Sequence, residues 1–205
     1  MFRNNLKIIY LLLLKVLHCF TPFYYSIFPL NRWKFHSKLE IGCGSIRRKG
    51  WLTLDYRPGP DVIWDLTKPM PFKDNSFEEI YSSHVLEHFT HSQLIFLLKE
   101  LHRVLKPSGK MSICVPDASI YVRAYNEKNP RELLRHKPAI ASERPMDFLN
   151  YIFYMGGEHK FMFDHDNLEF HLTSCGFKDY RIRQFDANLD GKDREYESLY
   201  AECYK

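Results

Sequence analysis

From residue 38 onward, short apolar runs alternate with stretches that repeat apolar positions at helical spacing. This alternation is typical of an α/β domain with a mostly parallel sheet. Strands are predicted at residues 38–41, 51–54, 61–64, 79–82, 110–115, 180–185 and 199–204. Turn-forming residues at 188–191 separate the last two runs, which predicts that these two strands are antiparallel neighbours.

Two helices are predicted between these strands. Residues 92–105 keep a helical apolar spacing, begin at the capping residue Ser92 and stop before Pro107. Residues 166–174 predict a second helix, which ends at Gly176. A glycine after the last helical residue is a common way for a helix to end.

The first 30 residues are rich in apolar side chains, which raises the question of a signal peptide or a membrane span. The uninterrupted apolar run covers only residues 8–14, far short of the about 20 residues that a spanning helix needs. Lys7, Lys15 and His18 instead form a narrow polar stripe beside a broad apolar face. We therefore expect an amphipathic helical segment within residues 1–36 that either packs on the domain or makes peripheral contact with a membrane.

The rest of the chain has the size and composition of one domain. With 205 residues, 45% of them hydrophobic, the chain is long enough to bury one core, which we place at residues 37–205. Within it, residues 118–165 are irregular and are expected to form a variable region that covers the site of the accepting substrate.

The net charge of +4 is too small to indicate nucleic acid as a partner. Five scattered cysteines without a C-x-x-C motif suit a reducing compartment, which favours a cytoplasmic protein.

The strongest local motif is Leu-Glu-Ile-Gly-Cys-Gly at residues 39–44, a predicted strand that leads directly into a Gly-x-Gly turn. Glycine is needed where the backbone turns sharply after a strand and a ligand approaches without a Cβ in the way. The second strand ends at Asp55, an acidic residue placed to accept hydrogen bonds from ribose hydroxyls. The third ends at Asp65 and Leu66, where a nucleoside base would lie.

These motifs and several that follow them resemble the class I S-adenosylmethionine-dependent methyltransferases, in particular the type 11 group. The matching segments are Glu40-Ile-Gly-Cys-Gly44, the strand end at Asp55, Pro71-Phe-Lys-Asp-Asn-Ser-Phe77, Ser83-His-Val-Leu-Glu-His88, and His102-Arg-Val-Leu-Lys-Pro-Ser-Gly109 leading into Val115-Pro-Asp117. Residues 168–177 resemble the last helix of that family. The resemblance implies a Rossmann-like sheet, mostly parallel with an antiparallel last strand, and S-adenosyl-L-methionine as the cofactor.

The resemblance also implies how the cofactor is bound. It places Glu40, Gly42, Cys43 and Gly44 around the methionine part, Asp55 at the ribose, Asp65 and Leu66 at the adenine, and Ser83 and His84 near the sulfonium. The chain departs from the pattern in its first connection. Only the ten residues 45–54 lie between Gly44 and Asp55, where a nucleotide-binding unit usually has about 20. The first crossover helix is therefore expected to be missing or reduced to a turn.

A basic loop, Arg47-Arg48-Lys49, stands where the third glycine of the pattern would be followed by a helix. It is either a solvated turn or a contact for an anionic acceptor such as a phosphorylated or acidic glycan. A similar shortened connection occurs in a subgroup of small methyltransferases associated with surface polysaccharide synthesis. That likeness implies a glycan, a lipid-linked molecule or another small molecule as the methyl acceptor.

Methyl transfer is an in-line displacement in which alignment supplies much of the acceleration, so no metal is expected. A hydroxyl acceptor would need a base, and we take His84, Asp117 and His159 as candidate catalytic residues, with His88 as a further possibility. Residues 84–88 also fit the H-x-x-E-H pattern of inverted zinc peptidases. That hydrolase is disfavoured because the motif follows a strand directly, whereas a zinc peptidase carries both histidines on one helix.

Two other classes of function stay open on the sequence. The same fold could serve an aminopropyl-type transferase or a non-methylating cofactor-binding protein, which transfer of label from methyl-labelled cofactor would distinguish. A non-catalytic module tethered to a membrane would bind liposomes but not the cofactor.

Overall fold

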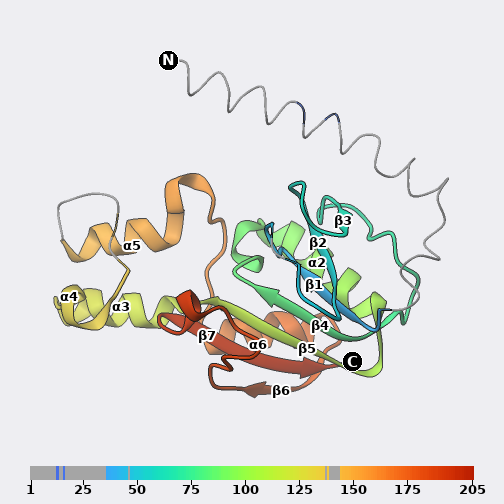
Figure 1. Ribbon diagram of the computed structural model, residues 1–205. Coiled ribbons are helices and arrows are strands. Elements are labelled where there is room, and N and C mark those ends of the chain that lie inside the picture. Colours follow the sequence, from blue (N-terminus) through green and yellow to red (C-terminus); the bar gives the residue numbers. More distant parts are fainter. Residues whose placement is uncertain (1–12, 14–15, 17–35, 46, 137, 139–143) are drawn as a thin grey trace.

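The computed structural model describes residues 36–45, 47–136, 138 and 144–205, together with Leu13 and Val16, both of which have helical backbone (Figure 1). Apart from those two residues, the amphipathic segment predicted within residues 1–36 lies outside the described residues. No helix in the part of the chain that the structure describes has the length and apolarity needed to cross a bilayer.

Seven strands form one sheet in the order β3-β2-β1-β4-β5-β7-β6. The strands are β1 (Lys38–Ile41), β2 (Leu52–Asp55), β3 (Val62–Ile63), β4 (Phe77–Ser83), β5 (Leu105–Pro116), β6 (Lys178–Ile182) and β7 (Ser198–Tyr204). The first five pair in parallel, while β7 runs antiparallel to both β5 and β6. The predicted sheet, mostly parallel with an antiparallel last strand, is confirmed, and the fold is the Rossmann-like class I methyltransferase fold.

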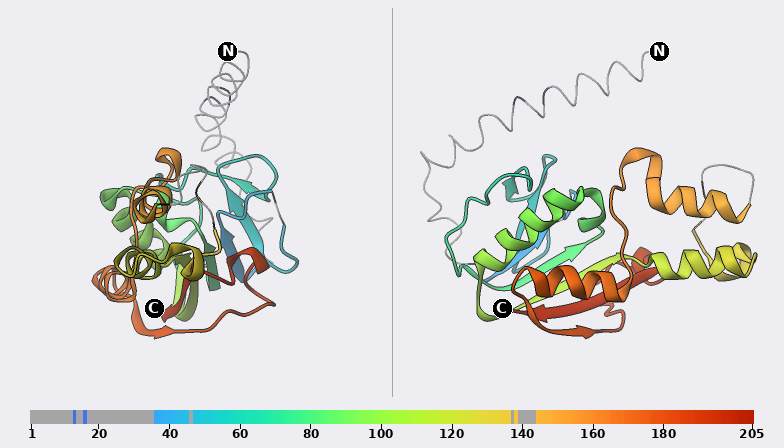
Figure 2. Two further views of the ribbon diagram at one scale, coloured as in Figure 1. Left: turned by 90° about the vertical axis from the view of Figure 1, so that its left-hand side faces the viewer. Right: turned by 180° about the vertical axis from the view of Figure 1, so that it is seen from behind.

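Both predicted helices are present. They are α2 (His91–Val104) and α6 (His165–Ser174), and they lie against the same face of the sheet (Figure 2). Helix α2 begins one residue earlier than predicted, because Thr90 rather than Ser92 precedes its first turn and its backbone amide donates to Gln93 Oε1 at 3.0 Å. The side chains of Thr90 and Gln93 each face the backbone amide of the other residue and so form a capping box. A capping box satisfies amide groups that the first turn of a helix leaves without partners.

The two faces of the sheet differ because residues that are paired across parallel strands point the same way. Leu39, Ile80 and Met111 are aligned on β1, β4 and β5 and are buried beneath the helices. The next position along the opposite face aligns Lys38, Glu79 and Lys110, and Glu79 forms ion pairs with Lys38 at 2.6 Å and with Lys110 at 3.3 Å. One face is therefore apolar and the other carries charge.

The missing crossover helix accounts for that charged face. The described residues between β1 and β2, 42–45 and 47–51, form turns and bends and contain no helix, as the short spacing predicted. A helix packed there would have required an apolar surface beneath it. The charged ladder is stable without one because its ion pairs remain partly in water.

The irregular stretch after β5 forms a small helical lobe with a core of its own. Its helices are α3 (Ala118–Asn126), α4 (Pro130–Leu133) and α5 (Pro145–Tyr154). They extend away from the sheet (Figure 1) and bury Tyr121, Leu134, Phe148 and Ile152 among themselves. Sequence reasoning had not expected this stretch to build a core, because its prolines hide the apolar spacing. Here Pro130 and Pro145 stand in the first turns of helices, where proline is tolerated.

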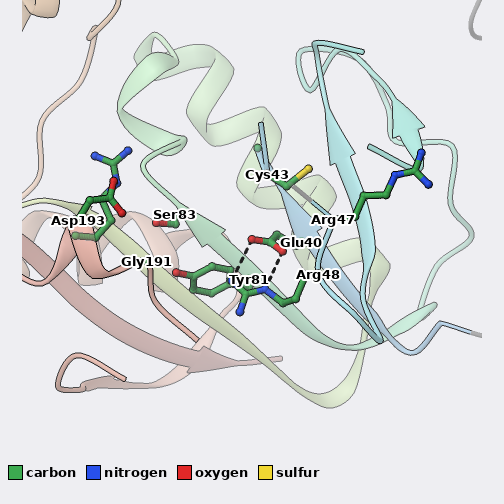
Figure 3. Close-up of a pocket in the computed structure, with 10 residues that line it drawn as sticks. Glu40, Cys43, Arg47, Arg48, Tyr81, Ser83, Gly191 and Asp193 are labelled. Carbon is green, nitrogen blue, oxygen red and sulfur yellow. Dashed lines mark hydrogen bonds and ion pairs between the residues drawn. The ribbon is translucent and has the colours of Figure 1, made fainter. Parts of the chain in front are cut away.

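The predicted pairing of the last two strands is confirmed, but their connection is not a tight hairpin. It runs from residue 183 to residue 197 and contains the short helical turn η4 (Lys192–Arg194). This β6–β7 connection reaches across the sheet to the ends of β1 and β4, where it forms one wall of a cavity (Figure 3).

Candidate functional site

A cavity of about 490 Å³ opens at the carboxyl ends of β1 and β4. This is where ligands bind in open α/β sheets. Its lining comes from the Gly-x-Gly turn, the basic loop, β4 and the β6–β7 connection: Glu40, Gly42, Cys43, Arg47, Arg48, Tyr81, Ser83, Gly191, Asp193 and Arg194 (Figure 3). Four residues that the sequence analysis selected for the methionine end of the cofactor, Glu40, Gly42, Cys43 and Ser83, are brought together there.

The turn after β1 depends on two glycines with left-handed backbone. Gly42 has φ +66°, and a Cβ there would lie 2.1 Å from Val85 Cγ2, so a side chain cannot be accommodated without displacing Val85. Gly44 has φ +65° but faces open space. Its amide donates to Asp55 Oδ2 at 2.8 Å, which joins the turn to the end of β2.

Asp55 holds two backbone amides in the present structure. Besides Gly44, its carboxylate accepts from the amide of Arg57 at 2.9 Å. It does not line the cavity. Asp65 and Leu66 do not line it either: Asp65 accepts from the amide and the hydroxyl of Thr67 at 2.9 and 2.7 Å, and Leu66 is buried in the core.

Arg48 closes one side of the cavity. Its guanidinium forms an ion pair with Glu40 at 2.9 Å, donates to the carbonyl of Leu189 at 2.8 Å and lies 5.0 Å from the centre of the Tyr81 ring (Figure 3). Arg47 pairs with Asp61 at 3.2 Å. Both arginines of the basic loop therefore have partners within the chain. Their positive charges are balanced by these contacts and do not require an anionic acceptor.

A buried network fixes the β6–β7 connection to β4. Asp190 accepts from Tyr81 Oη at 3.0 Å and from both terminal nitrogens of Arg183 at 2.6 and 2.7 Å. Burial raises the pKa of Asp190, but the hydrogen bonds from Arg183 outweigh burial and hold that pKa below its usual value. The carboxylate is charged at neutral pH, and it places Gly191 and Asp193 at the cavity.

Cys43 stands between the two glycines of the turn, and its thiol stays protonated at neutral pH. Burial, followed by the negative charges of Asp55 and Glu40, raises the pKa of Cys43 to about 12. The thiolate is the nucleophilic form of cysteine, so this side chain contributes shape rather than chemistry.

A second, smaller cavity of about 40 Å³ lies between the sheet and the helical lobe. It is lined by His84, Pro116, Tyr121, His136, Tyr151, Ile152, Met155, Arg194, Tyr196 and Glu197. Arg194 lines both cavities. Sequence reasoning missed Tyr81 of the larger cavity, the three tyrosines of the smaller one, and Arg194. None of them lies in a motif, and only the fold brings them together.

His84 stands where β4 ends, with a left-handed φ of 52°. Its amide donates to the carbonyl of Cys114 at 2.8 Å, and its Nε2 lies 3.0 Å from the hydroxyl oxygen of Ser198. Burial and the positive charge of Arg194 lower the pKa of His84 to about 2. The imidazole is therefore neutral at physiological pH.

The other two candidate catalytic residues line neither cavity. Asp117 is the N-cap of α3, where its Oδ1 accepts from the amide of Ser119 at 2.9 Å. His159 is buried, with Nδ1 2.5 Å from the carbonyl oxygen of Ile152, and its ring packs against His88 at 5.1 Å. The structure thus places only His84 of the three in the lining of a cavity.

Comparison with known proteins agrees with the fold. Residues 39–113 match the family model described as a methyltransferase domain. A search of curated proteins gave no match. Among solved structures, the fold is similar to a SAM-dependent methyltransferase from Archaeoglobus fulgidus, with a TM-score of 0.54, 16% identity and 94% of each chain covered.

Two further structures share the fold. A SAM-dependent methyltransferase from Thermotoga maritima, described as a possible histamine N-methyltransferase, has a TM-score of 0.53 at 16% identity over 92% of this chain and 99% of that one. The 1,6-didemethyltoxoflavin-N1-methyltransferase of Burkholderia thailandensis, with 1,6-didemethyltoxoflavin and S-adenosylhomocysteine bound, has a TM-score of 0.50 at 14% identity over 82% of this chain and 70% of that one. Residues 39–113 thus resemble a methyltransferase domain, and most of the chain shares the fold of these methyltransferases.

Proposed function

We propose that this chain transfers the methyl group of S-adenosyl-L-methionine to a small acceptor, with the cofactor in the larger cavity and the acceptor approaching from the side of the smaller one. The observation that carries the proposal is that Ser83 at the end of β4 lines the larger cavity, the next residue His84 lines the smaller one, and Arg194 lines both. A donor and an acceptor held on the two sides of the end of β4 can be aligned for in-line displacement, and such alignment removes a large part of the barrier.

The larger cavity suits the proposed cofactor in size and charge. Its volume of about 490 Å³ is within the range of about 300–1,000 Å³ for small-molecule sites. Carboxylates of Glu40 and Asp193 and the guanidinium of Arg194 line it, and these charges complement the ammonium and carboxylate of a methionine group. The adenosine part would then extend past Gly44 toward Asp55, with Asp65 and Leu66 beyond.

The chain's own residues would act mainly by positioning, while the cofactor supplies an activated methyl group. His84 is the candidate that would touch the acceptor, because it lines the smaller cavity as a neutral imidazole held by Ser198. Its very low pKa makes it a weak base in this environment. Asp117 caps α3, which carries Tyr121 of the same cavity, so we assign Asp117 a positioning role.

A sugar-containing or lipid-linked molecule is the acceptor that we favour. The shortened first connection supports it by resemblance, and so do the rings of Tyr121, Tyr151 and Tyr196 in the smaller cavity, since tyrosine offers an apolar face and a polar tip. We also propose a cytoplasmic location with peripheral membrane contact through residues 1–30, supported by the basic residues Arg3, Lys7 and Lys15.

Two measurements test the proposed function. Calorimetry with S-adenosylmethionine and S-adenosylhomocysteine should show one site per chain, and methyl-labelled cofactor should transfer its label to a small molecule in a polar or lipid extract. Replacement of Arg194 by alanine should reduce both cofactor binding and transfer, whereas replacement of the exposed Tyr154, at 63% exposure, should change neither. Binding without transfer of the methyl label to any extract would contradict methyl transfer and favour a cofactor-binding protein or an aminopropyl-type transferase.

A further inference from the structure

Three side chains outside both cavities form a cluster with the chemistry of a metal site. Glu87 and His88 belong to the short helical turn η2 (Leu86–His88), and His159 comes from the segment after α5. One potential ligand atom from each residue lies within 4.8 Å of the other two. This is the only group of three such ligands among the residues that the structure describes.

Glu87 lacks the partners that a buried carboxylate needs. Its side chain has no exposed surface, and neither carboxylate oxygen has a hydrogen-bond partner in the described chain. Nδ1 of His84 lies 3.5 Å from Oε1. Buried polar groups are ordinarily hydrogen-bonded, and buried carboxylates are ordinarily paired or bound to a metal, so the Glu87 side chain is incomplete as it stands.

The backbone contacts of the two histidines leave one ring nitrogen of each available to a metal. Nδ1 of His88 lies 3.0 Å from the carbonyl oxygen of Glu158, and Nδ1 of His159 lies 2.5 Å from that of Ile152. A carbonyl oxygen only accepts, so each Nδ1 carries the proton and each Nε2 keeps a free lone pair. Metal-binding histidines characteristically donate their second nitrogen to a carbonyl or carboxylate in this way.

Backbone hydrogen bonds hold the cluster together across distant parts of the sequence. The amides of Lys160 and Phe161 both donate to the carbonyl of Glu87, at 2.8 and 3.1 Å. His159 is thereby fixed next to η2. The ring of His159 lies 5.1 Å from that of His88 at an interplanar angle of 71°. Ile152, which holds the Nδ1 proton of His159, also lines the smaller cavity.

We propose that Glu87, His88 and His159 bind a divalent transition-metal ion beside the smaller cavity. Two imidazoles and one carboxylate are the ligand set of catalytic zinc sites and of non-haem iron sites, and three protein ligands leave coordination positions open. The set differs from the H-x-x-E-H pattern because His159, and not His84, supplies the second imidazole. His159 belongs to no short motif shared with Glu87 and His88, so the set has no signature in the sequence, and no metal was expected because methyl transfer itself needs none.

The consequence for catalysis rests on the proposed function. An acceptor hydroxyl that reached an open coordination position would lose its proton more readily, because a bound divalent cation lowers the pKa of its oxygen ligands. Metal binding itself does not depend on the methyl-transfer proposal.

The test is to titrate the full chain, freed of metal with a chelator, with Co²⁺ and then with Zn²⁺. We expect one Co²⁺ per chain, with visible absorption bands of nitrogen and oxygen ligation, displaced by Zn²⁺. Glu87→Gln, His88→Gln and His159→Gln should each weaken binding by at least about tenfold, as loss of groups around metal sites does. His91→Gln is the matched control, because His91 forms a similar ring pair with His171 at 5.3 Å that belongs to no such group.

Three readouts keep the outcome interpretable. Zn²⁺ should raise the melting temperature of the wild-type chain and of His91→Gln but not of Glu87→Gln, which keeps the shape of the side chain and removes its charge. Absence of binding to the wild-type chain, or binding that survives His159→Gln, would overturn the proposal, as would the intense near-ultraviolet bands of cysteine ligation. Cofactor affinity, measured on the metal-free chain, separates failure of this site from failure of the proposed function.

Discussion

Gly42 and Gly44 need glycine for different physical reasons, and this difference yields the first prediction. Gly44 has φ +65° and its Cβ position meets open space, which lies on the side where a ligand would approach the turn. Gly44→Val should cost about 1–2 kcal/mol of stability from left-handed strain and leave cooperative melting intact. Cofactor binding, measured by calorimetry, should be lost because the side chain occupies the space that the ligand needs.

Gly42→Ala is the contrasting variant. Its Cβ would lie 2.1 Å from Val85 Cγ2, so strain from the left-handed backbone is joined by overpacking that typically costs about 1–3 kcal/mol. We expect chemical denaturation to show a larger loss of stability for Gly42→Ala than for Gly44→Val. If Gly44→Val bound the cofactor as tightly as the wild-type chain, the cofactor would not lie against this turn.

Asp55 combines a structural and a binding task in the proposal. Its carboxylate holds the amides of Gly44 and Arg57, and hydrogen bonds to a charged group are worth about 1.5–3 kcal/mol each. In the proposal the same carboxylate also accepts hydrogen bonds from the ribose hydroxyls of the cofactor. Asp55→Ala removes these bonds and should therefore raise the dissociation constant for S-adenosylmethionine at least about tenfold. Asp74→Ala, which removes a 71% exposed carboxylate paired with Arg103, should leave affinity unchanged, and equal affinities for both variants would place the ribose elsewhere.

Among single residues, sequence reasoning identified those whose type is dictated by backbone geometry. A strand followed by Gly-x-Gly identifies Gly42 because few other residues tolerate its backbone. Tyr81 gives no such signal, since its role arises from a contact with Asp190, more than a hundred residues away in the chain. A side chain that acts through a distant partner becomes recognisable only when the fold is known.

The β6–β7 connection is the element on which the cavity wall depends, and Asp190 is its anchor. Asp190→Asn would leave the guanidinium of Arg183, which is 13% exposed, without a counter-ion. Removal of one partner of a buried pair costs about 3–5 kcal/mol. We expect a loss of stability near the lower figure in urea denaturation at pH 7, together with weaker cofactor binding, because Gly191 and Asp193 would no longer be held at the cavity.

The same variant carries a pH dependence. The folded chain holds the pKa of Asp190 below its usual value, so the stability contributed by Asp190 is present above the unfolded pKa of about 3.9. It is lost as the pH falls through the folded pKa. The difference in unfolding free energy between the wild-type chain and Asp190→Asn should therefore be constant from pH 5 to 8 and shrink below about pH 4. A difference that grew in acid would contradict this assignment.

Elements were predictable where periodicity is strong and unpredictable where it is absent. The apolar runs of β1 and β4 and the helical spacing of α2 stand out because each buries one side against the core. The connection from residue 183 to 197 has no apolar period, so only its turn-forming residues were visible, and they suggested a tighter hairpin. The short spacing between Gly44 and Asp55 carried more information, since it excluded a crossover helix.

For the whole molecule, the charged sheet face bears on where the amino-terminal segment packs. Lys38, Glu79 and Lys110 occupy the face that lacks covering helices among the described residues. An amphipathic helix docked there would place its apolar side chains against charges and desolvate them at a cost. That face is therefore a poor receptor for the broad apolar side predicted for residues 1–30, which favours a bilayer as its cover.

The last prediction follows from that argument. Deletion of residues 1–30 should release the chain from liposomes that contain anionic lipid, while cofactor binding and cooperative melting persist. Attachment of the full chain should weaken as salt is raised, because Arg3, Lys7 and Lys15 contribute attraction that is screened beyond about 10 Å at 0.1 M salt. Replacement of these three residues by glutamine is the matched control for charge. If the truncated chain aggregates or melts without cooperativity, the segment packs on the domain, because only a helix that buries core surface would leave the remaining fold unstable when removed.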